Sequence, residues 1–224
     1  NVINGGKHAD NSLAIQEFMI APAGFSHFPD ALRAGSEIFH ELRKTLHSRS
    51  LSTGVGDEGG FAPMIPGNSP HEDALKLLVE AIRSAGYEPG KNVWIALDCA
   101  SSEFCEMTGD RAVYSFEGKR LSSKEMLSVY QTWIDRYPIC SIEDGFGEHD
   151  WGGWALATQS IGSRCQLVGD DLYATNTKIL KKGIDQKASN AILIKVNQIG
   201  TVTESLETMK LARAHGIRTV VSHR

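Results

Sequence analysis

Three carboxylates in the sequence occupy equivalent places, each directly after a short apolar run. They are Asp98, Glu143 and Asp170. One acidic residue at the end of a strand is more often a helix-cap partner or a surface charge. Three carboxylates without a histidine or thiolate among the candidate ligands form an all-oxygen donor set, which suits Mg²⁺ with its other positions left to water and substrate. The pattern therefore favours a magnesium site.

A lysine and an arginine follow two further apolar runs. Lys195 comes after Ala191–Ile194, and Arg224 ends the segment Ser222-His223-Arg224. A salt bridge is the commoner role for a lone lysine, but a nearby divalent cation can depress its pKa enough for it to accept a proton. A guanidinium matches phosphate or carboxylate oxygens in pairs. Together these groups indicate proton abstraction from a phosphorylated or carboxylated acid.

Two glycine-rich segments and one strand-like segment carry the remaining candidate groups. Glu58 lies in Gly54–Gly60, where it is either an ordinary turn acid or a carboxylate on a movable loop, and His8 ends the other glycine segment. Neither segment matches a phosphate-binding loop or a dinucleotide fingerprint. Glu17 lies inside the strand-like run 15–22, so we expect it at a polar barrel mouth or on a solvent face.

The apolar runs alternate with helical patterns, which predicts parallel strands whose carboxyl ends share one face. In a (β/α) barrel that face carries the chemistry. The strands are expected at 93–97, 139–142, 166–169, 191–194 and 219–221. Helices are expected from Pro29 to about Arg49, from His71 to Ala85, from Ser122 toward Tyr137, and from Thr201 to a stop at Gly216.

Length and composition fit one large α/β domain that acts on a small molecule. The chain has 224 residues, 41% of them hydrophobic, and a net charge of −4, which gives no reason to expect nucleic acid. No apolar stretch approaches the length of a membrane span and no signal peptide is evident, which favours the cytosol. The four cysteines form no metal or redox spacing, so we expect reduced, mostly buried thiols. The chain starts at Asn1 and stops after a strand-like run, so we interpret it as a piece of a longer protein.

Several longer motifs resemble the enolase family, the glycolytic 2-phosphoglycerate dehydratases, in order along the whole chain. The segments that carry the resemblance are Asn4-Gly5-Gly6-Lys7-His8-Ala9, Gln16-Glu17-Phe18-Met19-Ile20, Val55-Gly56-Asp57-Glu58-Gly59-Gly60-Phe61-Ala62-Pro63, Ala96-Leu97-Asp98, Ser101-Ser102-Glu103-Phe104, Ser141-Ile142-Glu143-Asp144, Gly169-Asp170-Asp171-Leu172, Leu193-Ile194-Lys195-Val196-Asn197-Gln198-Ile199-Gly200-Thr201 and Ser222-His223-Arg224. The resemblance implies an enolase-type, TIM-like (β/α) barrel over residues 1–224. That barrel is incomplete, without the family's N-terminal α+β domain and its last strand.

The resemblance also implies roles for residues. Lys195 resembles the base that removes the proton beside the substrate carboxylate, and Glu58 the acid that helps the hydroxyl leave, with Glu17 assisting. Asp98, Glu143 and Asp170 resemble the ligands of Mg²⁺, which must stabilise the charge developing on the substrate. The implied substrate-binding set is His8, Gln16, Glu17, Glu143, Asp170, Lys195, Ser222, His223 and Arg224.

The resemblance also bears on oligomeric state, location and the behaviour of this piece alone. The family implies a homodimer in the cytoplasm, with an additional pool at the cell surface or outside the cell left open. The piece alone is expected to be inactive and poorly folded, because an incomplete barrel exposes apolar edges. Two alternatives stay open, a barrel of the same superfamily with another carboxylate substrate and a non-catalytic binding protein that retains the fold.

Overall fold

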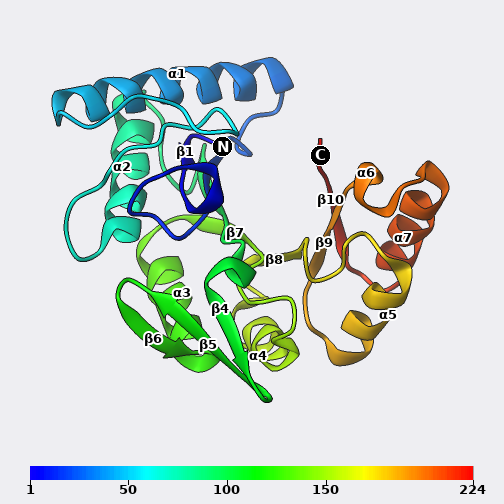
Figure 1. Ribbon diagram of the computed structural model, residues 1–224. Helices are drawn as coiled ribbons and strands as arrows, with labels where there is room; N and C mark the ends of the chain where they lie inside the picture. The colour runs from blue at the N-terminus through cyan, green and yellow to red at the C-terminus, as the bar shows by residue number, and fades with distance from the viewer. Residues whose placement is uncertain (224) are drawn as a thin grey trace. The chain divides into compact units, whose positions relative to one another are not determined.

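The computed structural model describes residues 1–223 (Figure 1). These residues divide into two compact units. Unit 1 comprises Asn1–Cys99 and Thr132–Cys140, and unit 2 comprises Ala100–Gln131 and the segment from Ser141 onward. Helices and strands alternate through most of the chain, which confirms the α/β class. No helix within these residues is both long and apolar enough to cross a membrane.

Unit 1 is built on a short antiparallel ladder covered by two helices. Its elements are β1 (Ile3–Asn4), the 3-10 turn η1 (Gly6–His8), β2 (Glu17–Ala21), α1 (Phe28–Ser48), α2 (Pro70–Ser84) and β3 (Trp94–Asp98). β1 pairs with β2 and β2 with β3, all antiparallel. Helices α1 and α2 pack against each other, and both lie within a residue or two of their predicted bounds (Figure 1).

The helix bounds in unit 1 follow from ordinary signals. A proline stands in the first turn of each helix, where its missing N–H costs nothing. Along α1, Ala34, Ile38 and Leu42 are fully buried at helical spacing, which fixes the face that it turns to the core. Gly86, with φ of 85°, follows the end of α2 as a left-handed residue.

Unit 2 contains a parallel ladder and a separate three-stranded sheet. Its elements are η2 (Ser101–Phe104), β4 (Cys105–Thr108), β5 (Arg111–Phe116), β6 (Lys119–Ser122), α4 (Trp151–Ile161), β8 (Gln166–Gly169), α5 (Thr177–Gln186), β9 (Ala191–Ile194), α6 (Val196–Ile199), α7 (Val202–Ala214) and β10 (Arg218–Val221). Two elements, α3 (Ser123–Arg136) and β7 (Ile139–Glu143), begin in one unit and end in the other.

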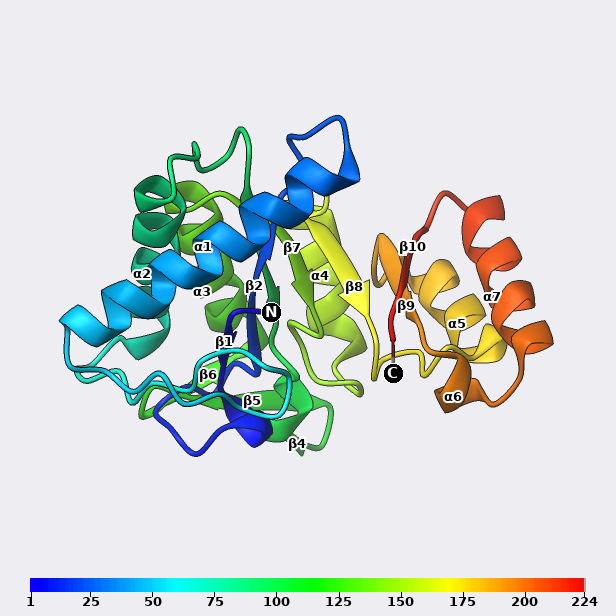
Figure 2. The ribbon, with the colours of Figure 1, turned by 90° about the horizontal axis from the view of Figure 1, so that it is seen from above.

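The parallel ladder runs in the order β7, β8, β9, β10, at positions where the sequence predicted parallel strands. Helices α5 and α7 lie on the same side of β9 and β10 (Figure 2). Along residues 1–223 the pairing partner of β10 is β9 alone, so the sheet is open at this end and forms no closed barrel. The incomplete barrel expected from the sequence is confirmed.

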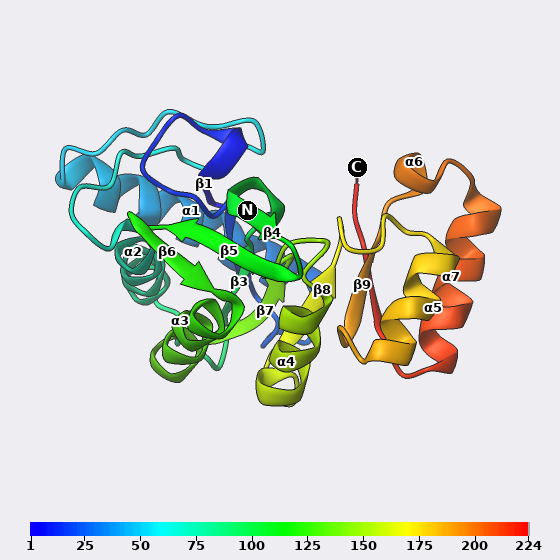
Figure 3. The same ribbon diagram turned by 60° about the horizontal axis from the view of Figure 1, so that its bottom comes forward.

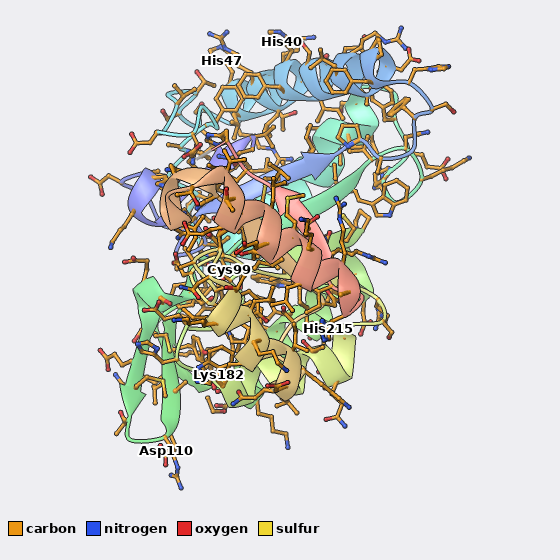
Figure 4. The ribbon with its side chains drawn as sticks, turned by 90° about the vertical axis from the view of Figure 1, so that its right-hand side faces the viewer. His40, His47, Cys99, Asp110, Lys182 and His215 are labelled. Atoms are coloured by element: carbon orange, nitrogen blue, oxygen red, sulfur yellow. The ribbon has the colours of Figure 1, made fainter. Side chains whose placement is uncertain are left out.

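The second sheet, β4-β5-β6, is an antiparallel meander that the sequence analysis did not anticipate (Figure 3). Asp110 lies at the tip of its first hairpin (Figure 4). Ala112, Tyr114 and Phe116 alternate as buried residues along β5, so one face of this sheet packs inward.

Candidate active site

In unit 1, the start of β2 and the end of β3 bring three of the predicted residues together. Because these strands are antiparallel, Glu17 is the register partner of Asp98. The side-chain amide of Gln16 donates to Asp98 Oδ2 at 3.2 Å, and its backbone N–H donates to Asp98 O at 3.1 Å. Asp98 is buried, so its carboxylate gains from this donor. The side chain of Glu17 lies beside His8 and Glu58, so it has polar neighbours.

His8 and Glu58 reach the same place from two loops. His8 Nδ1 lies 3.8 Å from Glu17 Oε1. Ligand-type atoms of His8, Glu17 and Glu58 all lie within 4.8 Å of one another, and the three side chains are half-buried. A histidine and two carboxylates at this spacing can exchange protons or bind one polar ligand.

The loop that carries Glu58 is bound tightly to the first residues of the chain. Buried Asn4 accepts a hydrogen bond from Gly60 N–H at 2.8 Å through Oδ1, and its own N–H donates to Phe61 O at 2.9 Å. A Cβ built at Gly56 would lie 2.4 Å from His8 O, so only glycine fits there. These contacts fix Glu58 close to His8.

In unit 2, the carboxyl ends of the parallel strands carry the other predicted residues. Glu143 ends β7, Asp170 follows β8, Lys195 follows β9 and Ser222 follows β10. The N–H of Ser222 donates to Ile194 O at 3.1 Å, which places this end of β10 beside the residue before Lys195. His223 is exposed in the last described position, and Arg224 lies outside the described residues.

Lys195 and Asp170 are in direct contact. Lys195 Nζ donates to Asp170 Oδ2, and 24% of the lysine side chain is exposed against 8% of the aspartate side chain. The backbone N–H of Lys195 donates to Thr175 Oγ1 at 2.8 Å, which fixes the backbone from which the lysine side chain extends. The other aspartate oxygen, Oδ1, is buried and has no hydrogen-bond partner among residues 1–223.

A buried carboxylate oxygen without a donor is costly unless a ligand satisfies it. The oxygen-rich donor set at these strand ends therefore fits Mg²⁺, with Asp170 Oδ1 as the best-supported contact. Asp98 lies in unit 1, whereas Glu143 and Asp170 lie in unit 2, so the complete three-carboxylate site stays a prediction.

Sequence reasoning gave no role to Asp144, which the structure places beside this site. Carboxylate oxygens of Asp144, Asp170 and Asp171 lie within 4.8 Å of one another. The only signal in the sequence was its position directly after Glu143 at the end of a predicted strand.

The family model described as the enolase C-terminal TIM barrel domain matches residues 1–224, the whole chain. The match agrees with the parallel strands, with their polar carboxyl ends and with the oxygen-rich donors found there. The chain therefore belongs to the enolase family through its C-terminal TIM barrel domain, and so to a superfamily of lyases and racemases.

Proposed function

We propose that this domain carries the active site of a Mg²⁺-dependent hydro-lyase that interconverts 2-phospho-D-glycerate with phosphoenolpyruvate and water, the enolase reaction of glycolysis. The observation that supports it most strongly is the contact between Lys195 Nζ and buried Asp170 at the ends of two neighbouring parallel strands. A lysine held in this way is positioned to take a proton from a substrate bound over the strand ends.

In the proposed reaction, Lys195 removes the proton from C2 of 2-phosphoglycerate. The electron pair left on C2 forms the C2–C3 double bond as the C3 hydroxyl departs, and Glu58 donates a proton so that the hydroxyl leaves as water. His8 and Glu17, which lie beside Glu58, are proposed to bind the substrate and to assist this proton transfer. When bound, Mg²⁺ supplies positive charge for the substrate carboxylate, whose C2 proton is otherwise too weakly acidic for an amine.

The remaining predicted residues bind and orient the substrate. Gln16, Ser222, His223 and Arg224 are proposed to hold its phosphate and carboxylate groups, and Asp98, Glu143 and Asp170 to ligate Mg²⁺. We also propose that the protein acts in the cytoplasm as a homodimer, as enolases do.

The test is Mg²⁺-dependent formation of phosphoenolpyruvate from 2-phosphoglycerate by the full-length protein, with Lys195→Ala and Glu58→Gln beside it. We expect turnover that stops on chelation and in the lysine variant. Exchange of the C2 proton with solvent should stop in Lys195→Ala but persist in Glu58→Gln, because only the first removes the base. A well-folded protein with no turnover would instead indicate another superfamily substrate or a non-catalytic role.

A further inference from the structure

Asp144 occupies a strained and buried position at the end of β7. Its φ is 41°, in the left-handed region that aspartate tolerates better than most residues, and only 3% of it is exposed. Its backbone N–H donates to Val168 O at 2.9 Å, and its carbonyl accepts from Ser101 N–H at 3.0 Å. The backbone of Asp144 therefore joins the end of β7 to β8 and to η2.

The side chain of Asp144 binds the backbone at the end of the next strand. Oδ1 accepts the N–H of Asp170 at 2.9 Å, and Oδ2 accepts the N–H of Asp171 at 2.7 Å. Hydrogen bonds from N–H groups to a carboxylate are charge-assisted and about twice as strong as neutral ones. Since both oxygens of Asp144 are engaged with these amides, the three neighbouring aspartates form a bracket in which Asp144 holds the other two.

The segment held by this bracket also fixes Lys195. Asp170 O accepts the N–H groups of Tyr173 and Ala174 at 3.0 and 2.8 Å, which forms a tight turn. That turn ends at buried Thr175, whose Oγ1 accepts the N–H of Lys195. A shift of the Asp170 backbone would therefore move the Asp170 carboxylate that Lys195 contacts. Through Thr175, it would also move the backbone of Lys195.

From these contacts we propose that Asp144 is a positioning residue for the reaction. It fixes the backbone of Asp170 so that Oδ2 meets Lys195 while the buried, unpartnered Oδ1 is presented to a divalent cation. This inference rests on the proposed function for the identity of the cation and the substrate. An Asp144 that only closed a turn would contribute to stability and leave cation affinity unchanged.

Asp144→Asn in the full-length protein tests the proposal. The amide can accept one N–H, but its NH₂ group would face the other donor, so one of the two bonds is lost. The measurement is Mg²⁺ affinity by titration calorimetry without substrate, and losses of about 10- to 100-fold are typical when an outer-shell partner of a metal ligand is removed. We expect a loss in this range.

Asp150→Asn is the matched control, because Asp150 is another buried carboxylate in unit 2 that caps a backbone N–H but contacts none of the proposed site residues in the described part of the chain. It should lower the melting temperature and leave Mg²⁺ affinity unchanged. An affinity in Asp144→Asn equal to that of the parent, or an equal loss in both variants, would overturn the positioning role.

Hydrogen exchange in a peptide covering residues 166–173 gives a second readout that needs neither Mg²⁺ nor turnover. The amides of Asp170 and Asp171 should exchange faster in Asp144→Asn than in the parent and in Asp150→Asn. Unchanged exchange there would refute the bracket. If the parent protein binds no Mg²⁺ or makes no phosphoenolpyruvate, the proposed function fails, and this measurement still decides whether Asp144 holds the segment.

Discussion

Removal of the Asp150 side chain should destabilise unit 2. Its carboxylate accepts the hydroxyls of Tyr114 and Ser123, each at 2.6 Å, and the N–H of Gly153 at 2.9 Å. It therefore joins β5, the start of α3 and the first turn of α4. One buried side chain thus holds the start of its own helix, α4, together with β5 and α3, which lie earlier in the sequence.

The structure gives the size of the effect of Asp150→Ala. Loss of an N-cap costs about 1 kcal/mol. The buried Tyr114 hydroxyl loses its acceptor, which costs about 1–3 kcal/mol, while the partly exposed Ser123 hydroxyl can turn to water at little cost. We expect the free energy of unfolding to fall by about 2–4 kcal/mol in total.

Denaturant unfolding followed by tryptophan fluorescence measures this directly, because Trp151 and Trp154 lie in the helix that Asp150 caps. Tyr114→Phe keeps the cap but removes one of the three bonds and also the acceptor of the buried Gly147 N–H, so it should lose about 1–3 kcal/mol. An Asp150→Ala transition within about 0.5 kcal/mol of the parent, the range of ordinary surface substitutions, would refute the reasoning.

Two further outcomes can be checked on the full-length protein. Burial raises the pKa of Tyr173 from 10.0 to about 12, although the hydrogen bond between its hydroxyl and Ser189 acts in the opposite direction. Tyr173 therefore ionises at lower pH in the unfolded state than in the folded state. The free energy of unfolding should fall as the pH rises from 10.0 to about 12. Denaturant melts at several pH values check this, and Tyr173→Phe should flatten the slope; an unchanged slope would contradict it. Gly56→Ala should move the Glu58 loop and reduce turnover at least tenfold, because the new Cβ would meet His8 O at 2.4 Å. In the control Gly54→Ala, the Cβ meets only Ser52 Oγ at 3.4 Å, so a similar loss of turnover there would contradict this explanation.

The elements that the sequence predicted correctly are those whose own residues determine them. Proline in the first turn, helical spacing of buried residues and a glycine after the last turn set the bounds of α1 and α2. The meander β4-β5-β6 was missed because most side chains of β4 and β6 are exposed, which leaves no apolar run. The alternation of Ala112, Tyr114 and Phe116 and the left-handed turn glycines Gly109 and Gly118 were the available signals.

The candidate site likewise has features that could be predicted from the sequence and features that could not. Strand-end residues such as Asp170 and Lys195 could be predicted because parallel strands bring their carboxyl ends to one face. A salt bridge was the commoner role expected for Lys195, but its partner, Asp170, could not be predicted, since it depends on which rotamer each side chain adopts. The antiparallel start of the sheet was also beyond the sequence pattern, yet it sets Glu17 opposite Asp98.

The role of Asp144 was hidden for a physical reason. Its partners are backbone N–H groups, which every residue except proline possesses. No particular pair of residue types in the sequence therefore predicts the contact. A metal-binding carboxylate and a carboxylate that holds the metal-binding turn have the same chemistry at the level of sequence, and here they stand side by side as Glu143 and Asp144. What separates them is the direction of the side chain, which follows from the left-handed φ of Asp144 and from the two N–H groups it meets. Residues that hold a turn at the end of a strand in this way have to be identified from backbone geometry, and substitution there should alter ligand affinity before it alters the fold.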